Sequence, residues 1–253
     1  MKRWSQMLTV AGLGIAMTLT LATSPALALS LTGNYFTLSA THPDTSTLGS
    51  KIDGTTVTGL VSPALVGGLP VYTGLVSPSG PITDTTGGAI QWWTAHAGIV
   101  TADKVQVDSF TGGTLGGGAF ANNFFPTGQA SDADGYRTVH WTGVFHVGAG
   151  GASLSLSADD DAWLFLNNGL VLDNGGVKAI SAATTSTTNL VAGDYVVDLF
   201  FADRHPVQSG IAFTCEGCLD PVPEPATLLL FGTTLAGLGA VVRRRLKGNK
   251  EVA

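Results

Sequence analysis

The stretch "SLSADDDAWLFLNNGLVLDNGG", from Ser155 to Gly176, decides the fold expected for this chain. Small polar and apolar residues alternate in its first part, and two apolar runs follow, joined by the pair Asn168-Gly169. Alternation with a period of two is typical of a strand with one buried face. An Asn-Gly pair between two apolar runs favours a hairpin with a two-residue turn. The stretch therefore predicts a strand followed by a β-hairpin.

Three further segments carry the same period of two. They are "RTVHWTGVFHV" (137–147), "GASLSLSA" (151–158) and "DYVVDLFFAD" (194–203). Helical periodicity is hard to find between the two ends of the chain, and short apolar runs alternate with turn residues. The sequence predicts an all-β domain over residues 29–220, an antiparallel β-sandwich of the jelly-roll kind.

The N-terminal end has the pattern of a secretory signal peptide. Lys2 and Arg3 precede an apolar stretch, and "SPALALS" then places Ala26 and Ala28 at the spacing of a small-residue cleavage site. We expect a signal peptide over residues 1–28 and a mature chain that begins near Leu29. An uncleaved membrane anchor is the alternative.

The C-terminal end, residues 221–253, combines a short motif, an apolar run and a basic tail. Residues 226–242 carry no charge and are just long enough to cross a bilayer as a transmembrane helix, and the basic tail at 243–250 favours a cytoplasmic end. Together with Pro223, Glu224 and Pro225 they resemble the PEP-CTERM sorting signal. The resemblance implies an exported bacterial protein held in the membrane until an exosortase processes it, and then placed at the cell surface or in the extracellular matrix. A plain tail anchor is the alternative.

The charge of the central region excludes one class of partner. Residues 29–222 contain sixteen acidic and five basic side chains, a net charge of about −11, whereas the whole chain carries −6. Nucleic-acid binding needs a basic surface, so we expect no nucleic-acid partner. Fifteen of the sixteen acidic residues are Asp, which suits both tight turns and Ca²⁺ ligation. Composition alone does not separate these two uses.

The cysteines are Cys215 and Cys218, in "CEGCLDP". In an exported protein this pair favours a small disulfide over a redox centre or half of a zinc site, and no second pair is present to complete such a site.

Asp159, Asp160 and Asp161 stand side by side at the mouth of an apolar strand. Adjacent carboxylates repel one another, so either a bound cation or water must compensate them. Ca²⁺ takes six to eight oxygen ligands, which suits neighbouring carboxylates on a loop. A solvated turn, in which one Asp caps backbone N–H groups, is the alternative.

The segments "LTGNYF", "VHWTGVFHV", "SLSADDDAWLFLNNGLVLDNGG" and "YVVDLFFADRH" resemble, in this order, the fibro-slime variant of the protective-antigen-fourteen domain. The resemblance implies a β-sandwich of surface proteins, adhesins and carbohydrate-active enzymes. Its lectin members hold Ca²⁺ through two consecutive aspartates joined by a cis peptide bond, and the ion binds sugar hydroxyls. This maps onto Asp160 and Asp161, with Asp159-Asp160 as the alternative register. Further oxygen donors nearby are Asn167, Asp173 and Asn174.

Two other features bear on function. Trp92 and Trp93 are adjacent, and if they lie on a strand one ring points outward as a platform for sugar stacking.

We find no nucleophile elbow, zinc-protease motif or phosphate loop and assign no catalytic residue. We therefore expect a non-enzymatic binding module, with Ca²⁺ as cofactor and an extracellular polysaccharide as partner. A structural matrix protein without a ligand site is the alternative, and a carbohydrate-active enzyme is a third.

Overall fold

The computed structural model describes residues 29–46, 50–111, 114–115, 124–180 and 185–219. The predicted signal peptide and the whole sorting signal, with its motif, helix and basic tail, lie outside the described residues. Within the described ranges the regular elements are β-strands, and no helix there is long and apolar enough to cross a membrane. The all-β prediction is confirmed.

Thirteen strands follow one another along the described chain. They are β1 (Leu29–Ser39), β2 (Thr85–Thr86), β3 (Ala89–Ile90), β4 (Val100–Thr111), β5 (Thr114–Leu115), β6 (Gly135–Val147), β7 (Ala152–Asp159), β8 (Asp161–Leu166), β9 (Gly169–Asn174), β10 (Ser186–Leu190), β11 (Gly193–Ala202), β12 (Gly210–Glu216) and β13 (Cys218–Leu219).

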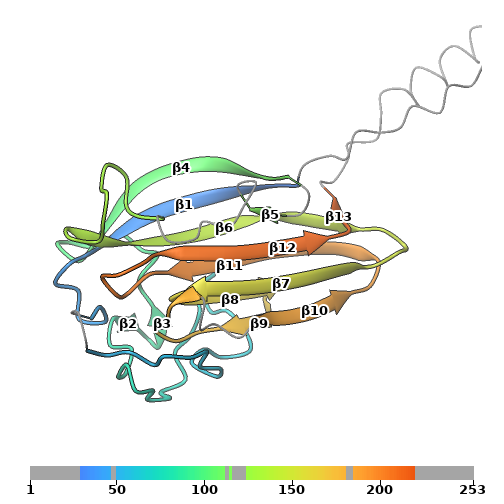
Figure 1. The fold of residues 1–253 in the computed structure, drawn as a ribbon. Coiled ribbons are helices and arrows are strands. Elements are labelled where there is room, and N and C mark those ends of the chain that lie inside the picture. The colour runs from blue at the N-terminus through green and yellow to red at the C-terminus, as the bar shows by residue number, and fades with distance from the viewer. Residues whose placement is uncertain (1–28, 47–49, 112–113, 116–123, 181–184, 220–253) are drawn as a thin grey trace, which may run out of the picture.

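The main sheet folds over on itself and forms two facing layers. Its strand order is β10-β7-β12-β5-β4-β1-β6-β11-β8-β9, with β13 beside β6, and the pairings between these strands are antiparallel. In Figure 1, β12, β7 and β10 lie in front of β6, β11, β8 and β9. The result is the predicted antiparallel sandwich.

The first hydrophobic core fills the space between the two layers. β7 contributes alternate residues, including Leu154 and Leu156, while the serines between them point outward. Phe213 of β12 and Phe145 of β6 stack at 6.2 Å between ring centroids. The period of two in the sequence arises from this core, because each strand places every second side chain inside.

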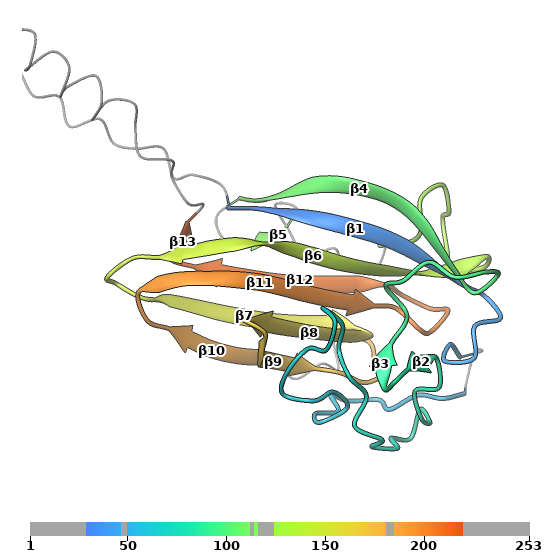
Figure 2. The same ribbon diagram turned by 180° about the vertical axis from the view of Figure 1, so that it is seen from behind.

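A second hydrophobic core covers the outer face of β8 and β11. β8 and the last part of β11 are buried on both faces: Leu164 of β8 points into the first core, whereas Trp163 and Phe165 point into the second. The segment between β1 and β4, mostly without regular strands, lies over this face (Figure 2) and supplies Trp92 and Trp93. The unbroken apolar run "AWLFL" is explained by this double burial.

The hairpin between β8 and β9 is confirmed, but its turn lies one residue earlier than the sequence indicated. Leu166 pairs with Gly169, so the central turn residues are Asn167 and Asn168, with φ of 50° and 70°. A two-residue turn of this kind needs positive φ at both positions, and Asn tolerates that conformation better than most residues.

Candidate functional site

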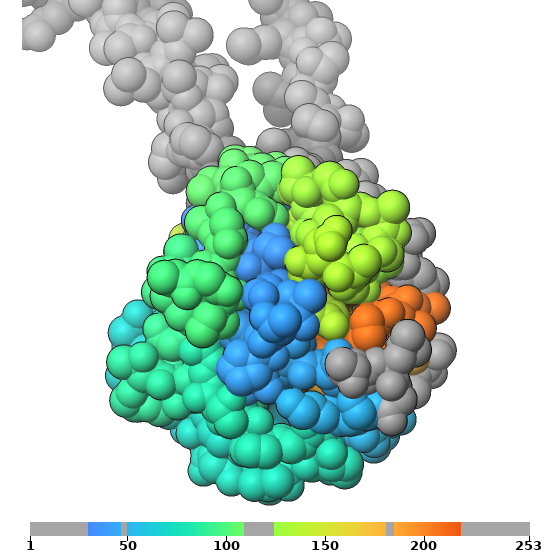
Figure 3. Space-filling view, turned by 90° about the vertical axis from the view of Figure 1, so that its left-hand side faces the viewer, coloured from blue at the N-terminus to red at the C-terminus, as the bar shows by residue number. Residues whose placement is uncertain are grey.

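The aspartate triplet lies at the end of the sandwich where three loops meet. Asp159 ends β7 and Asp161 begins β8, and the peptide bond between Asp159 and Asp160 is cis. The segments that follow β1, β9 and β11 surround the triplet. Figure 3 looks onto this end, where the orange segment after β11 lies near the light-blue segment after β1.

Asp161 is committed to a buried ion pair. Its Oδ2 lies 2.6 Å from Arg204 Nε, and its Oδ1 accepts the N–H of Gly176 at 2.6 Å. The Arg204 guanidinium also lies over the ring of Trp92, at 5.0 Å from the centroid. Burial by itself lowers the pKa of Arg204, but the charge and hydrogen bond of Asp161 and the charges of Asp160 and Asp44 together outweigh it, and the pKa lies above its usual value. Asp161 therefore holds the loop after β11 in place.

Asp160 joins the loops after β9 and β11. Its Oδ1 accepts the N–H of Lys178 at 2.9 Å, and its Oδ2 accepts the N–H of Arg204 at 2.7 Å. The ammonium of Lys178 points away from this carboxylate and donates to the backbone carbonyls of Asp160, Asn174 and Gly176. Asp159 is less engaged: among the described residues, the hydrogen bond to its carboxylate is a long one, from the Ile180 N–H at 3.3 Å.

The cluster holds more negative than positive charge. Five carboxylates are at most 3% exposed, namely Asp132, Asp159, Asp160, Asp161 and Asp203. Two basic side chains, Lys178 and Arg204, are buried with them. If all of these groups were ionised, three negative charges would remain uncompensated among side chains that are almost fully buried.

This imbalance raises carboxyl pKa values. Burial, together with the charge of Asp159, raises the pKa of Asp132 to about 6, and burial raises that of Asp159 to about 6 as well. Burial and the neighbouring carboxylates hold the pKa values of Asp160 and Asp203 well above the usual range. The folded protein therefore retains protons on this cluster that the unfolded chain would release.

Three buried polar atoms around the triplet have no hydrogen-bond partner among the described residues: Oδ1 of Asp132, Oδ2 of Asp203 and Nε2 of His205. The Asp132 and Asp203 carboxyl groups are within hydrogen-bonding reach of each other. Burial lowers the pKa of His205, which favours its neutral imidazole. Since buried polar groups are normally paired, a proton shared between the Asp132 and Asp203 carboxyl groups would satisfy that pair within the protein itself.

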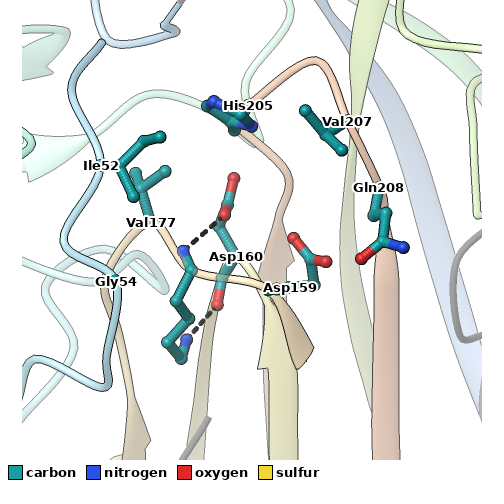
Figure 4. A pocket seen from close by; sticks show the side chains of 10 residues that line it. Ile52, Gly54, Asp159, Asp160, Val177, His205, Val207 and Gln208 are labelled. Atoms are coloured by element: carbon teal, nitrogen blue, oxygen red, sulfur yellow. Dashed lines mark hydrogen bonds between the residues drawn. The ribbon is translucent and has the colours of Figure 1, made fainter. Parts of the chain in front are cut away.

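A pocket of about 260 Å³ opens above the triplet. Figure 4 shows the Asp159 and Asp160 side chains pointing toward the space beneath His205. The pocket is lined by Ile52, Gly54, Asp159, Asp160, Val177, Lys178, Ala179, His205, Val207 and Gln208. Asp161 does not line it, so Asp159 and Asp160 are the pair that a ligand can reach.

No three His, Cys, Asp or Glu side chains in the described part of the chain are arranged as a ready-made metal centre. A cation bound at Asp159 and Asp160 would therefore need backbone carbonyls or water to complete its shell. Such mixed oxygen shells are common for Ca²⁺.

The structure does not bring the other predicted oxygen donors to this pocket. Asn167 lies in the turn at the far end of β8, about 20 Å along the strand from Asp161, so its assignment as a ligand is wrong. Asp173 accepts hydrogen bonds from the Gly59 N–H and from Trp163 Nε1. Asn174 accepts from the Ala158 N–H and donates to the Leu156 carbonyl. Both side chains stabilise the fold.

The predicted stacking platform is also wrong. Trp92 and Trp93 are buried in the second core, with ring centroids 5.6 Å apart. They lie in a turn, so the strand rule that would send one ring outward does not apply. Trp92 Nε1 donates to Asp44 at 2.8 Å and Trp93 Nε1 to the Phe201 carbonyl at 3.0 Å.

The cysteine pair forms the predicted disulfide between Cys215 and Cys218, at the junction of β12 and β13.

Sequence reasoning missed Asp132 and Asp203 as members of the cluster. Asp203 follows a clear strand and precedes Arg204, which was a usable signal, whereas Asp132 lies in a loop with no motif around it.

The raised pKa values lead to a pH-dependent prediction for Asp132→Asn in EDTA. The folded protein holds the Asp132 proton up to about pH 6, whereas the unfolded chain releases it near 3.8. Between these values the folded state binds more protons, so this group costs stability as the pH rises. The variant should therefore gain melting temperature relative to the wild type from pH 4 to 6.5. Asp194→Asn, at an exposed position, is the control and should show no such trend.

Two family models match parts of the chain. The PA14 domain family, the protective-antigen-fourteen domain, matches residues 127–218, and the PEP-CTERM protein-sorting motif matches residues 221–245. Residues 127–218 are therefore similar to a domain family that is a carbohydrate-binding-like module. The chain is an exported protein with a C-terminal membrane anchor before exosortase processing. The two matches favour an exported binding or structural module.

Curated relatives share only part of their length with this chain. Protein psiB of Dictyostelium discoideum is 33% identical over 106 residues, which cover 35% of this chain and 19% of that protein. Protein psiE of the same organism is 43% identical over 56 residues, 21% of this chain and 11% of that protein. The chain thus matches at most about a fifth of either relative. A solved β-glucosidase from Kluyveromyces marxianus in complex with glucose has a TM-score of 0.29 and 14% identity, over 68% of this chain and 20% of that one.

Proposed function

We propose that this exported chain binds carbohydrate through a calcium ion held by Asp159 and Asp160. The charge imbalance of the buried cluster carries the proposal: five carboxylates face two basic side chains, and Ca²⁺ would offset most of the difference. The two carboxylates border a pocket that solvent can enter, so the ion could also accept ligand hydroxyls. The PA14 match and the sorting motif support a glycan partner outside the cell.

The pair differs from the one mapped first from the sequence. Asp161 forms a buried ion pair with Arg204 and lies outside the pocket, whereas Asp159 and Asp160 line it. Behind the pair lie the buried carboxyl groups of Asp132 and Asp203, and an ionised Asp132 would strengthen the negative potential of the site. The residues present therefore fit a hard cation with oxygen ligands.

The alternative function is that of a structural matrix protein without a ligand. One observation favours it: the carboxylates of Asp160 and Asp161 already accept backbone N–H groups of Gly176, Lys178 and Arg204, as a purely structural knot would. The two functions differ in what EDTA does to glycan binding.

Retention on immobilised bacterial exopolysaccharides tests the proposal. We expect retention in millimolar Ca²⁺, and its loss by at least tenfold in EDTA and in Asp159→Asn. This variant should fold, because an Asn oxygen can still accept the Ile180 N–H. Asp194→Asn should bind like the wild type. Retention that neither EDTA nor Asp159→Asn changes would contradict the calcium mechanism, and degradation of the polysaccharide would indicate an enzyme.

A further inference from the structure

The wall of the pocket is aliphatic. Around the two carboxylates stand the side chains of Ile52, Val177 and Val207. Figure 4 shows Ile52 and Val177 on one side of Asp160 and Val207 on the other. Apart from the imidazole of His205, no aromatic ring is among the residues that line the pocket, so a sugar bound here would not stack on a flat ring.

Two of these side chains are unusually exposed for their type. Ile52 is 43% and Val207 is 53% exposed, whereas most aliphatic side chains of the described residues are buried. Neither lies in a loose loop. Asp53, next to Ile52, accepts the N–H groups of Val177 and Ser79 at 2.7 and 2.8 Å. The Val207 N–H donates to the His205 carbonyl at 2.9 Å. The fold thus holds apolar surface at the rim of a charged pocket, where a ligand would cover it.

The size of the pocket limits the ligand. Its volume of about 260 Å³ lies just below the range of about 300–1,000 Å³ typical of drug-sized ligands, which suits one sugar ring at the end of a chain. A cation at Asp159 and Asp160 would bind ring hydroxyls, and the aliphatic wall would meet the substituent on the other side. A hydroxymethyl group there would lose hydrogen bonds to water, whereas a methyl group would lose none.

We infer that the pocket takes a terminal 6-deoxyhexose, a sugar that carries a methyl group where common hexoses carry hydroxymethyl. This inference rests on the proposed calcium site, since the ion supplies the polar half of the recognition. Apolar pockets discriminate between ligands that differ by one small group by about 10- to 200-fold, and a site this open belongs at the lower end. The expected preference is therefore about tenfold.

Matched sugar pairs test the inference. The full chain, in a detergent without a sugar headgroup and with millimolar Ca²⁺, is titrated with D-fucose and D-galactose, and then with L-rhamnose and L-mannose. Saturation-transfer NMR measures these weak affinities. We expect the 6-deoxy sugar of at least one pair to bind about tenfold more tightly than its hydroxylated partner.

Variants locate the preference on the wall. Ile52→Ser and Val207→Ser should remove the preference while leaving the calcium-dependent melting shift intact. Leu75→Ser and Val196→Ser, at 43% and 54% exposure outside the pocket, are the matched controls and should keep it.

The outcomes separate this inference from the function on which it rests. The inference is overturned if Ca²⁺ raises the melting temperature but the two sugars of each pair bind equally, or none of the four sugars binds. The proposed calcium site then stands. A methyl preference that persists in EDTA overturns the calcium site and keeps the aliphatic wall.

Discussion

Arg204→Met is expected to lower the free energy of unfolding by about 3–5 kcal/mol, because removing one partner of a buried ion pair leaves the other charge uncompensated. The Arg204 and Asp161 side chains are almost completely buried, and their nitrogen and oxygen atoms lie 2.6 Å apart. The cluster already carries excess negative charge, so loss of the guanidinium would increase the imbalance. Met keeps much of the apolar contact with Trp92.

Urea unfolding at pH 7 in EDTA measures this effect. Asp194→Asn is the control, because its partner His146 and Asp194 itself are exposed, and exposed pairs contribute about 0–1 kcal/mol. A loss below about 1 kcal/mol for Arg204→Met, with an unchanged slope against urea, would mean that the ion pair does not hold this end of the sandwich together.

Trp92→Ala is expected to cost about 3–5 kcal/mol, the usual range for truncating a buried aromatic side chain. The Trp92 ring is fully buried, stacks on Trp163 at 6.2 Å between centroids and donates a hydrogen bond to Asp44. Truncation would open a cavity in the second core, under Arg204. Calcium-dependent glycan retention, measured well below the melting temperature, should remain.

The same urea experiment measures the cost of Trp92→Ala, and Val105→Ala is its control, since Val105 is largely exposed and should change stability by no more than about 0.5 kcal/mol. If Trp92→Ala abolished glycan retention while leaving stability unchanged, the ring would belong to a binding surface and the second core would be misassigned.

Local sequence patterns predicted five strands of the sandwich, β6, β7, β8, β9 and β11. The period of two in β6, β7 and β11 and the turn residues after β8 are short-range signals, and the structure follows them, with the turn one residue earlier than predicted. Residues 50–99 carry no such pattern, because they cover the outer face of β8 and β11 through isolated bridges and loops. Their role depends on tertiary packing that no local period reveals.

The site was predictable only in its centre. The aspartate triplet was recognisable in the sequence because three adjacent carboxylates repel one another. The sequence did not show that the three aspartates have different roles. Arg204 comes from another loop and forms an ion pair with Asp161, whereas Asp159 lines the pocket. Asn167 was a wrong choice of ligand because it is only six residues from Asp161 in sequence but lies at the opposite end of β8. Asp132 reaches the cluster only through the folding of its loop, which the sequence does not encode as a motif.

Thermal melting of the full chain in millimolar Ca²⁺ and in EDTA, with Asp159→Asn beside the wild type, tests the central claim most directly. A ligand at a hundred times its Kd adds about 2.7 kcal/mol of stability. For a domain of this size that corresponds to a melting shift of roughly 5–10 °C. The calcium site predicts this shift in the wild type and its absence in Asp159→Asn. Equal melting temperatures of the wild type in Ca²⁺ and in EDTA would contradict the calcium site. The aspartates would then be a hydrogen-bonded cluster with a purely structural role.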